Sequence, residues 1–554
     1  MILQHVNDIA AICAAHGITD AVISPGSRSA AVTLAFDKHP DINTHVITDE
    51  RSAAFIAMGI AQQQQRPAVL ICTSGSAGLN YAPAVAEAYY QEIPLIVLTA
   101  DRPPEWIDQY DGQTIIQSGM FGNHVKASFE LPINPDHKDS KWQSNRIVNE
   151  AIIKSFDDTN GPVHINIPIR EPFYPDREEE ISFSNDLRII QKPSIEKRLS
   201  AERIGTLSNT WNNSANRWIV IGQNKPDEDL AKALELLGQS VVIINEITAN
   251  QHAVKGAIQN QDALFSPNET ESIKAPELLI TFGNSLISKN LKLFLRENPP
   301  KTHWHINDSS RMNDSLQSLS EMIQMAPSSF LNDLIPHVNL DSKSSLLSQL
   351  EEKFEKKKNT FLLTVSFGEF KAVHKVMDSL PENVILHLAN SMSVRYANFV
   401  GGLKEGIEVY CNRGTSGIDG SNSTAIGATI ATNRLNLLIT GDLAFFYDRN
   451  AFWNNEDYSN LRVVILNNDG GGIFNMIPGP KAQTNTEKLF LTPHGLKAFH
   501  LAEEFDLTYY PVHTEAELNE RLKNFFDPSD KAQIIEVFSD IPMNTEILDQ
   551  FKSI

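Results

Sequence analysis

Short runs of apolar and β-branched residues recur along the first third of the chain, each followed by apolar positions at helical spacing. The runs are apolar at consecutive positions, which is typical of parallel strands buried on both faces. Strand and helix in regular alternation predict a doubly wound α/β domain. The runs are Asp20–Pro25, Thr44–Asp49, Pro67–Ser74, Pro94–Asp101 and Pro162–Pro168.

The same alternation returns twice further along the chain. The later runs are residues 217–222, 241–246, 277–283 and 302–308, then 383–390, 407–412, 435–442, 461–469 and 532–538. Polar segments separate the groups, at Asp176–Arg198, which reads as a linker, and at Leu340–Thr360, where "EEKFEKKKN" predicts a solvated helix. We therefore expect three doubly wound α/β domains, at residues 1–180, 195–340 and 360–554.

Composition places this chain among soluble globular proteins, at 41% hydrophobic and 21% charged residues. No apolar run reaches membrane-spanning length, and the amphipathic N-terminus lacks the basic leader of a signal peptide. Cys13, Cys72 and Cys411 lie far apart in apolar contexts, which favours buried thiols over a disulfide framework or a metal site. We expect a cytoplasmic protein.

The net charge of −21 disfavours partners such as nucleic acid and anionic membranes. If the substrates are anions, local arginines must supply the positive charge. Arginines in turns rich in glycine and serine are therefore candidates for binding residues.

Polar and glycine-rich turns follow the predicted strands of the first and last domains, and hardly occur in the middle one. In parallel sheets, ligands bind outside the carboxyl ends of the strands. Turn chemistry alone explains some of these residues, but their density points to a site. The turns are Ser24–Ser29, Asp49–Arg51, Ser74–Gly78, Asp101–Pro103, Asn390–Arg395, Asn412–Gly420, Gly441–Asp442 and Asn467–Gly472.

One pair of turns carries the strongest chemical signal. Gly441 and Asp442 end one strand, and Asn467-Asn468-Asp469-Gly470 ends the next, roughly two dozen residues later, which suits a single crossover. A carboxylate, an amide oxygen and a main-chain carbonyl are ligands for Mg²⁺ or Ca²⁺, with phosphate oxygens completing the shell. Glycine-rich turns and helix N-termini add N–H donors for a diphosphate. Taken singly, Asp442 could instead cap a helix and the second turn could be only a turn.

Together these turns resemble the fingerprint of thiamine diphosphate enzymes, Gly-Asp followed by Asn-Asn. The resemblance implies that Asp442, Asn468 and the Gly470 carbonyl hold Mg²⁺, or Mn²⁺, which bridges to the cofactor's diphosphate. Leu443 replaces the usual glycine, as in one branch of the superfamily. Further implied cofactor contacts are Ser416, Gly417, Ile418, Gly441, Leu443, Ala444, Ile473 and Phe474.

Glu50 has two interpretations. By its sequence context it is an acid in the first turn of a helix capped by Thr48 or Asp49. By the resemblance it is the catalytic acid that hydrogen-bonds the cofactor's aminopyrimidine, contributed across a subunit boundary. Asp49 and Arg51 then serve only as a cap and a surface charge, and Ile418 supports the bent cofactor.

Nearly the whole chain resembles the family of 2-succinyl-5-enolpyruvyl-6-hydroxy-3-cyclohexene-1-carboxylate synthases. The motifs "SPGSRS", "TADRPPE" and "NRGTSGIDG" are highly specific as a set, although any one of them alone would be weak. The resemblance implies a transferase of menaquinone biosynthesis. Such an enzyme decarboxylates 2-oxoglutarate with thiamine diphosphate and adds the remaining succinyl-semialdehyde carbanion to isochorismate in a 1,4-addition.

Both substrates carry carboxylates, for which arginine is the bidentate partner. By motif position, Ser391, Arg395 and Arg413 are expected to hold 2-oxoglutarate. Lys289 matches a family lysine, but Asn290 follows it where the family often has arginine. Surface ion pairs are the alternative role for each arginine. The residues expected to face isochorismate are Ser27, Arg28, Arg102 and Gln113.

The resemblance also implies a homodimer or homotetramer with active sites at the dimer interface. The middle domain lacks a glycine-rich dinucleotide fingerprint, so we predict no FAD. Two alternatives remain. One is another thiamine diphosphate enzyme, an acetolactate synthase or a 2-oxoacid decarboxylase, although the His-His pair typical of pyruvate decarboxylases is missing. The other is a non-catalytic cofactor-binding regulator.

Overall fold

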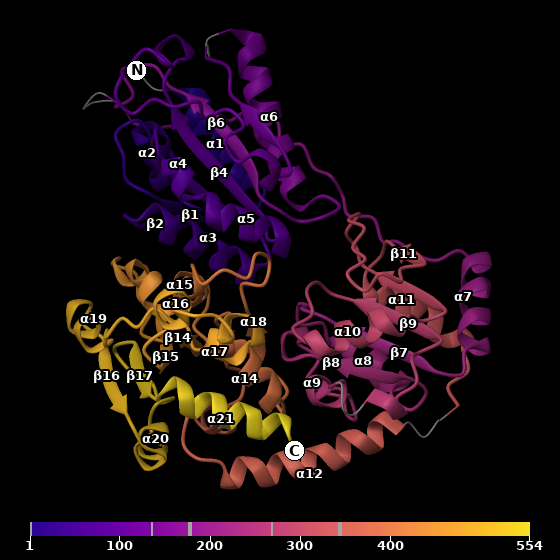
Figure 1. The fold of residues 1–554 in the computed structure, drawn as a ribbon. Helices are drawn as coiled ribbons and strands as arrows, with labels where there is room; N and C mark the ends of the chain where they lie inside the picture. Colours follow the sequence, from indigo (N-terminus) through magenta and orange to yellow (C-terminus); the bar gives the residue numbers. More distant parts are fainter. Residues whose placement is uncertain (1–2, 134–136, 176–179, 267–269, 342–345) are drawn as a thin grey trace. The chain divides into compact units, whose positions relative to one another are not determined.

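The computed structural model describes residues 3–133, 137–175, 180–266, 270–341 and 346–554, so part of the predicted linker 176–198 lies outside the described residues. It contains three parallel β-sheets with helices, which confirms the predicted fold class (Figure 1). Contacts group the chain into two compact units. The first unit comprises Met1–Ser194, Asn412–Asn433 and Ala444–Leu461, and the second comprises Ile195–Cys411, Arg434–Leu443 and Arg462–Ile554.

The first sheet has the strand order β2-β1-β3-β4-β6-β5. Four of its strands are entirely buried, as their apolar runs predict, whereas β2 lies at an edge and leaves Val46 53% exposed. The strands are β1 (Asp20–Ile23), β2 (Asn43–Val46), β3 (Ala68–Cys72), β4 (Leu95–Asp101), β5 (Ser128–Glu130) and β6 (Val163–Pro168). The helices are α1 (Gln4–Ala15), α2 (Ala30–Lys38), α3 (Glu50–Gln64), α4 (Ala77–Asn80), α5 (Ala82–Gln91) and α6 (Lys138–Phe156).

The second sheet, β11-β10-β9-β7-β8, lies in the second unit. Its strands are β7 (Arg217–Ile221), β8 (Val242–Asn245), β9 (Leu278–Phe282), β10 (Thr302–Ile306) and β11 (Glu321–Ile323). Its helices are α7 (Ala201–Asn213), α8 (Glu228–Leu237), α9 (Gln261–Leu264), α10 (Lys289–Glu297) and α11 (Pro327–Leu334).

The third sheet repeats the arrangement of the first, in the order β13-β12-β14-β15-β17-β16. Its strands are β12 (Ile385–Leu388), β13 (Glu408–Tyr410), β14 (Asn436–Gly441), β15 (Leu461–Asn467), β16 (Thr508–Val512) and β17 (Gln533–Phe538). The helices from here to the C-terminus are α12 (Leu346–Thr364), α13 (Glu369–Asp378), α14 (Met392–Val400), α15 (Ser421–Ala431), α16 (Asp442–Tyr447), α17 (Ile473–Met476), α18 (Pro478–Lys481), α19 (Phe499–Glu504), α20 (Glu515–Leu522) and α21 (Ile541–Lys552).

In the first and third sheets the strand order reverses beside the first strand. The chain moves outward from β1 to β2 and returns to β3, and it moves from β12 to β13 and returns to β14. Such a reversal leaves a crevice outside the carboxyl ends of the two inner strands, where ligands bind in doubly wound sheets. The turns that follow β12 and β14 therefore flank a favoured binding position.

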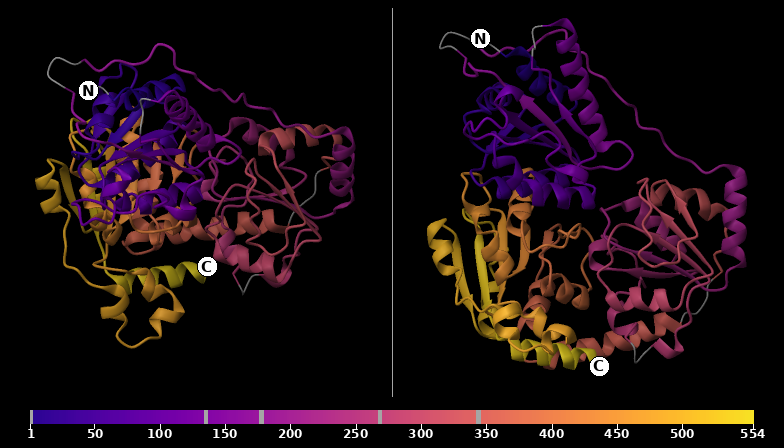
Figure 2. Two further views of the ribbon diagram at one scale, coloured as in Figure 1. Left: turned by 90° about the horizontal axis from the view of Figure 1, so that it is seen from above. Right: turned by 45° about the horizontal axis from the view of Figure 1, so that its top comes forward.

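Helix α12 was predicted to be solvated, and this is wrong for one of its faces. Phe354, Phe361 and Leu362 are buried, and Phe551 of α21, the yellow helix in Figure 2, packs against the two phenylalanine rings. Even Lys358 is buried, because its ammonium donates to the Val400 carbonyl at 2.9 Å. The dense charges of "EEKFEKKKN" mask this apolar stripe in the sequence.

Helices α3 and α15 pack closely within the first unit. A Cβ on Gly59 would lie 2.2 Å from the Thr424 carbonyl oxygen, and one on Gly427 would lie 2.1 Å from that of Ile56. Only glycine permits this approach of two backbones. The packing fixes α3, whose first residue is Glu50, against α15, which follows the loop 412–420.

A buried cluster of charges joins β1, β2 and a later segment of the first unit. His45 contacts the carboxylates of Asp20 at 3.0 Å and Glu456 at 2.9 Å. Burial lowers the pKa of the His45 imidazole, but the two carboxylates outweigh burial and raise it to about 9. His45 is therefore a cation at neutral pH, paired on both sides.

We predict that His45→Ala lowers the stability of the first unit by about 3 kcal/mol near neutral pH, because Asp20 and Glu456 lose their partner. The folded-state pKa of His45 lies above its unfolded value. The stabilisation is therefore complete below about pH 6.5 and is lost as the pH rises through about 9. Thermal melting of the wild type and of His45→Ala, at about pH 6 and about pH 10, measures this loss of stability.

The exposed His500→Ala variant is the control and should melt like the wild type at both pH values. A deficit of His45→Ala that is equally large at the higher pH would contradict the paired-cation interpretation.

Candidate functional site

The carboxyl ends of β14 and β15 meet at a buried carboxylate. Asp442, the first residue of α16, is 2% exposed. Its Oδ2 accepts hydrogen bonds from the backbone N–H of Asn468 at 3.2 Å and of Gly470 at 3.0 Å. Burial raises the pKa of this carboxyl, although the hydrogen bonds from Leu443 and Gly470 and the nearby His494 oppose the shift. The predicted pair of turns is thus joined directly.

The side-chain amide of Asn468 has a defined orientation. Its Nδ2 donates to Oε1 of Glu369 at 2.6 Å, whereas its Oδ1 is buried and has no hydrogen-bond partner among the described residues. A Cβ on Gly472 would lie 2.8 Å from Nδ2, so glycine is needed there. A buried acceptor oxygen without a partner calls for an explanation, and a ligand is one.

The turn at Gly470 also depends on glycine. Its φ is +155°, and a Cβ would lie 2.3 Å from the Leu491 carbonyl oxygen. The loop after this turn brings His494 to the site, where Nε2 lies 3.2 Å from Oδ2 of Asp442. The sequence analysis did not identify His494, since it lies in a loop with no motif around it. Nearby, Ile473 and Phe474 begin α17, and both are half-buried.

These donors suit a hard divalent cation. The Asp442 carboxylate, the Oδ1 of Asn468 and the Gly470 carbonyl all offer oxygen, which Mg²⁺ prefers. Within the described ranges, no group of three or more His, Cys, Asp and Glu side chains is arranged to hold a metal. Three protein oxygens leave the octahedral shell of Mg²⁺ incomplete, so a cation here would take the rest of its shell from water or a ligand.

The turn after β12 lies across the same reversal of strand order. Ser391 has φ 73° and ψ −126°, a conformation that costs a non-glycine residue about 1–3 kcal/mol and clusters at functional sites. Nη1 of Arg395 donates to the Ser391 carbonyl at 2.7 Å. The structure thus brings Ser391 and Arg395 together, as predicted. Lys289 is exposed at the start of α10 in the same unit, and Asn290 donates to the Asp262 carbonyl.

In the first unit, Glu50 begins α3, as predicted. Asp49 caps the helix by accepting from the N–H of Ser52 at 3.2 Å, and Asn80 donates to Oε2 of Glu50 at 3.3 Å. The half-buried Glu50 therefore does not serve as the cap. Arg51 is not a plain surface charge: its Nη2 donates to the Tyr447 carbonyl, and its guanidinium lies 4.5 Å from the centre of that ring.

The loop 412–420 is anchored by a residue that the sequence analysis missed. Glu87 is 1% exposed, and its carboxylate accepts from the N–H of Gly414 at 2.7 Å and of Thr415 at 2.6 Å. The available signal was an acid on the alanine- and valine-rich face of α5. Beyond the anchor, Ser416 has a positive φ and Ile418 is 40% exposed.

The predicted arginines Arg28 and Arg102 each contact both a main-chain carbonyl and a carboxylate. Arg28 is buried; it donates to the Ile169 carbonyl at 3.1 Å and pairs with the exposed carboxylate of Glu171 at 3.3 Å. Arg102 donates to the Gly112 carbonyl and pairs with Asp111 at 2.8 Å. The remaining predicted residues of this unit are Ser27, which lies 3.3 Å from the Tyr174 hydroxyl, the exposed Gln113, and the half-buried Arg413 and Gly417.

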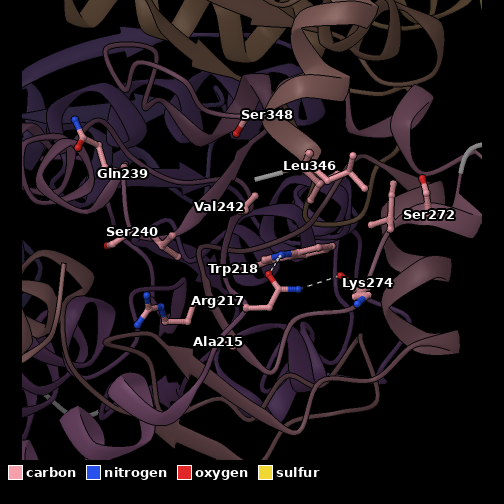
Figure 3. Close-up of a pocket in the computed structure, with 15 residues that line it drawn as sticks. Ala215, Arg217, Trp218, Gln239, Ser240, Val242, Ser272, Lys274, Leu346 and Ser348 are labelled. Carbon is pink, nitrogen blue, oxygen red and sulfur yellow. Dashed lines mark hydrogen bonds between the residues drawn. The ribbon is translucent and has the colours of Figure 1, made fainter. Parts of the chain in front are cut away.

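A cavity of about 340 Å³ lies elsewhere, at the amino ends of β7 and β8 (Figure 3). Arg217, Ser240 and Lys274 line it. Asn216 bridges the Trp218 ring N–H and the Lys274 carbonyl, so part of its polar wall is already paired. None of the predicted site residues lines this cavity, and it lies at the opposite end of its strands from the edge where such sheets bind ligands.

Two comparisons relate the chain to known proteins. Residues 4–122 match the family described as thiamine pyrophosphate enzyme, N-terminal TPP binding domain, and residues 194–388 match the middle domain of thiamine pyrophosphate enzymes. A protein of Cytophaga hutchinsonii is 45% identical over 99% of this chain and 98% of its own length. Proteins of Flavobacterium johnsoniae and Bacteroides thetaiotaomicron are 39% and 38% identical, over 98% and 99% of this chain and 97% and 98% of their own lengths. All three relatives are named 2-succinyl-5-enolpyruvyl-6-hydroxy-3-cyclohexene-1-carboxylate synthase.

The strain at Ser391 yields a prediction. Ser391→Gly should raise the free energy of unfolding by about 1 kcal/mol, because glycine adopts φ 73° and ψ −126° without the steric cost. This is a net value, since the greater conformational entropy of glycine in the unfolded chain offsets part of the gain. The midpoint of thermal melting measures the effect.

Asn383→Gly is the control, since Asn383 has a similar φ of 61° but asparagine tolerates the left-handed region. It should give a smaller gain. A Ser391→Gly variant less stable than the wild type would show that the hydroxyl, and not the backbone strain, dominates at this position.

Proposed function

The chain belongs to the family of 2-succinyl-5-enolpyruvyl-6-hydroxy-3-cyclohexene-1-carboxylate synthases, which are thiamine diphosphate enzymes, and on this premise we propose its reaction. It decarboxylates 2-oxoglutarate and joins the remaining succinyl-semialdehyde unit to the ring alkene of isochorismate by a 1,4-addition, in menaquinone biosynthesis. The observation that carries the proposal is the buried carboxylate of Asp442 bonded to the turn of Asn468 and Gly470.

We assign the metal to this turn. Asp442, Asn468 and the Gly470 carbonyl hold Mg²⁺, or Mn²⁺, against the diphosphate, and the unpartnered Oδ1 of Asn468 supports this. When bound, thiamine diphosphate supplies the nucleophilic carbon and accepts the electrons released with CO₂. The protein residues that line it are Ser416, Gly417, Ile418, Gly441, Leu443, Ala444, Ile473 and Phe474.

Glu50 is the catalytic acid in this proposal. It holds a proton at N1′ of the cofactor's aminopyrimidine, as general acid–base chemistry requires. The capping role that competes with this function falls to Asp49, so the Glu50 carboxylate is not needed to start α3. Ile418, whose side chain is 40% exposed, would contact the cofactor.

The substrates meet two groups of cations. Ser391, Arg395 and Arg413 bind 2-oxoglutarate. Isochorismate is bound by Ser27, Arg28, Arg102 and Gln113, with Lys289 as a further contact. Asn290 adds no charge beside Lys289 and bonds the Asp262 carbonyl, so Lys289 acts without the second cation often found in the family.

The names of the relatives favour this reaction over an acetolactate synthase, a 2-oxoacid decarboxylase or a non-catalytic regulator. We also propose domain boundaries at residues 1–180, 195–340 and 360–554, and a cytoplasmic location. The buried thiols of Cys13, Cys72 and Cys411 suit a reducing compartment. In the described part of the chain, no helix is long and apolar enough to cross a membrane.

Two substitutions should separate cofactor binding from catalysis. Asp442→Ala removes a metal ligand and should abolish calorimetrically measurable binding of Mg²⁺ and thiamine diphosphate. Glu50→Gln keeps the shape of the side chain but cannot exchange the proton. It should bind the cofactor as the wild type does and lose about 100-fold or more in turnover of 2-oxoglutarate with isochorismate.

Unchanged cofactor binding in Asp442→Ala would overturn the metal assignment. Full turnover in Glu50→Gln would overturn the assignment of the catalytic acid. Acetolactate formation from pyruvate by the wild type, without consumption of isochorismate, would favour the alternative enzyme class.

We further propose a homodimer or homotetramer in which Glu50 and Asp442 of one site come from different chains. Hybrids of the Glu50→Gln and Asp442→Ala chains, purified through two different affinity tags, then contain one intact site in every two. They should recover up to about half of the wild-type turnover. Hybrids as inactive as the two parent variants would show that both residues of a site come from one chain.

A further inference from the structure

Glu369 is a buried acid that the proposed reaction does not use directly. It is the first residue of α13 and is 1% exposed. Its Oε1 accepts from Nδ2 of Asn468 at 2.6 Å, and the buried phenol of Tyr396 neighbours its carboxyl. Burial raises the pKa of Glu369 to about 8, and the nearby Asp442 raises it further against the effect of Asn468. Burying a carboxyl costs free energy, so the position of Glu369 beside Asn468 calls for an explanation.

The orientation of the Asn468 side-chain amide explains why a carboxyl is buried beside it. An asparagine amide presents an oxygen on one side and an NH₂ group on the other, and only the oxygen can bind a cation. Oε1 of Glu369 accepts the hydrogen bond from Nδ2, which holds the amide in the orientation with its nitrogen toward Glu369 and its oxygen away from it. Oδ1, which has no partner among the described residues, is then left for a ligand.

The surroundings reinforce this selection. Nδ2 lies where a Cβ on Gly472 would be 2.8 Å away, so the glycine makes room for the NH₂ group. The backbone N–H of Asn468 is held by Asp442, which fixes the residue from its other side. Glu369 itself is placed by α13, whose first N–H donates to Oδ1 of Asn544 at 3.1 Å.

We propose that Glu369 is a positioning residue that turns the Asn468 amide so that its oxygen, and not its nitrogen, meets the divalent cation. This inference rests on the proposed function, which makes Asn468 a metal ligand. Residues that orient metal ligands typically change metal affinity by about 10–100-fold when they are replaced.

The test measures the Mg²⁺ affinity of the full-length protein by calorimetry in the presence of thiamine diphosphate. Glu369→Leu removes the acceptor and should weaken Mg²⁺ binding by about 10–100-fold. Glu369→Gln retains a carbonyl acceptor for Nδ2 and should bind Mg²⁺ nearly as well as the wild type. Glu351→Leu, which removes a half-buried carboxyl that accepts from the backbone N–H of Gln259, is the control for stability and should not change the affinity.

The same Glu369 substitution made in an Asn468→Asp variant separates a positioning role of Glu369 from a general structural role. In Asn468→Asp both side-chain atoms are oxygens, so orientation no longer matters, and Glu369 now faces a second carboxylate. Glu369→Leu should then strengthen Mg²⁺ binding, a reversal of its sign in the wild-type background. Weakening by a similar factor in both backgrounds would overturn the proposal.

Asn468→Ala tests the proposed metal site separately from the role of Glu369. If Asn468→Ala leaves Mg²⁺ affinity unchanged, the proposed metal site is wrong, and the role of Glu369 falls with it. If Asn468→Ala weakens binding but Glu369→Leu does not, the metal site stands and only the positioning role is overturned.

Discussion

The Asp442 carboxylate lies buried at the end of β14, and the geometry of the candidate site depends on how it is satisfied. A buried carboxylate needs hydrogen bonds, and this one takes them from the backbone of Asn468 and Gly470. The end of β15 is thereby held beside the end of β14. The turn that results is so tight that Gly470 and Gly472 cannot carry side chains. A single acid thus sets the positions of the other two proposed metal ligands.

The parallel sheet provides the frame for this interaction. Because the strand order reverses between β12 and β14, the turns after both strands face a common crevice. The turn after β14 carries Asp442, and the turn after β12 carries the strained Ser391 and Arg395. Proposed cofactor and substrate ligands therefore lie at one edge of one sheet, where rigid strands fix the spacing that loops alone would leave variable.

The elements of the fold that depend on a local apolar pattern could be predicted from the sequence. The buried strands were predicted because they are apolar on both faces. The strands β5, β11 and β16 were missed because they are short edge strands with half-exposed residues, and β16 contains Pro511. The turns proposed to hold the metal, and Ser391, were predicted from motif and resemblance. Their partners were not, since Glu87 lies 328 residues from Thr415 and Glu369 lies 99 residues from Asn468. No local pattern records such a contact.

Under the proposed function, a strongly acidic protein binds anionic substrates. With a net charge of −21, the chain repels anions at long range, so attraction must come from short-range contacts. Arg28 and Arg395 each donate to a main-chain carbonyl, of Ile169 and of Ser391. Each of these arginines also has an acid nearby, since Arg28 pairs with Glu171 at 3.3 Å and Arg395 interacts electrostatically with Asp262. The buried acids Glu87 and Glu369 accept from main-chain and amide N–H groups in turn. These buried acids hold segments of the framework in place, and under the proposed function the contacts with carboxylates and a diphosphate fall to the arginines and N–H groups that this framework positions.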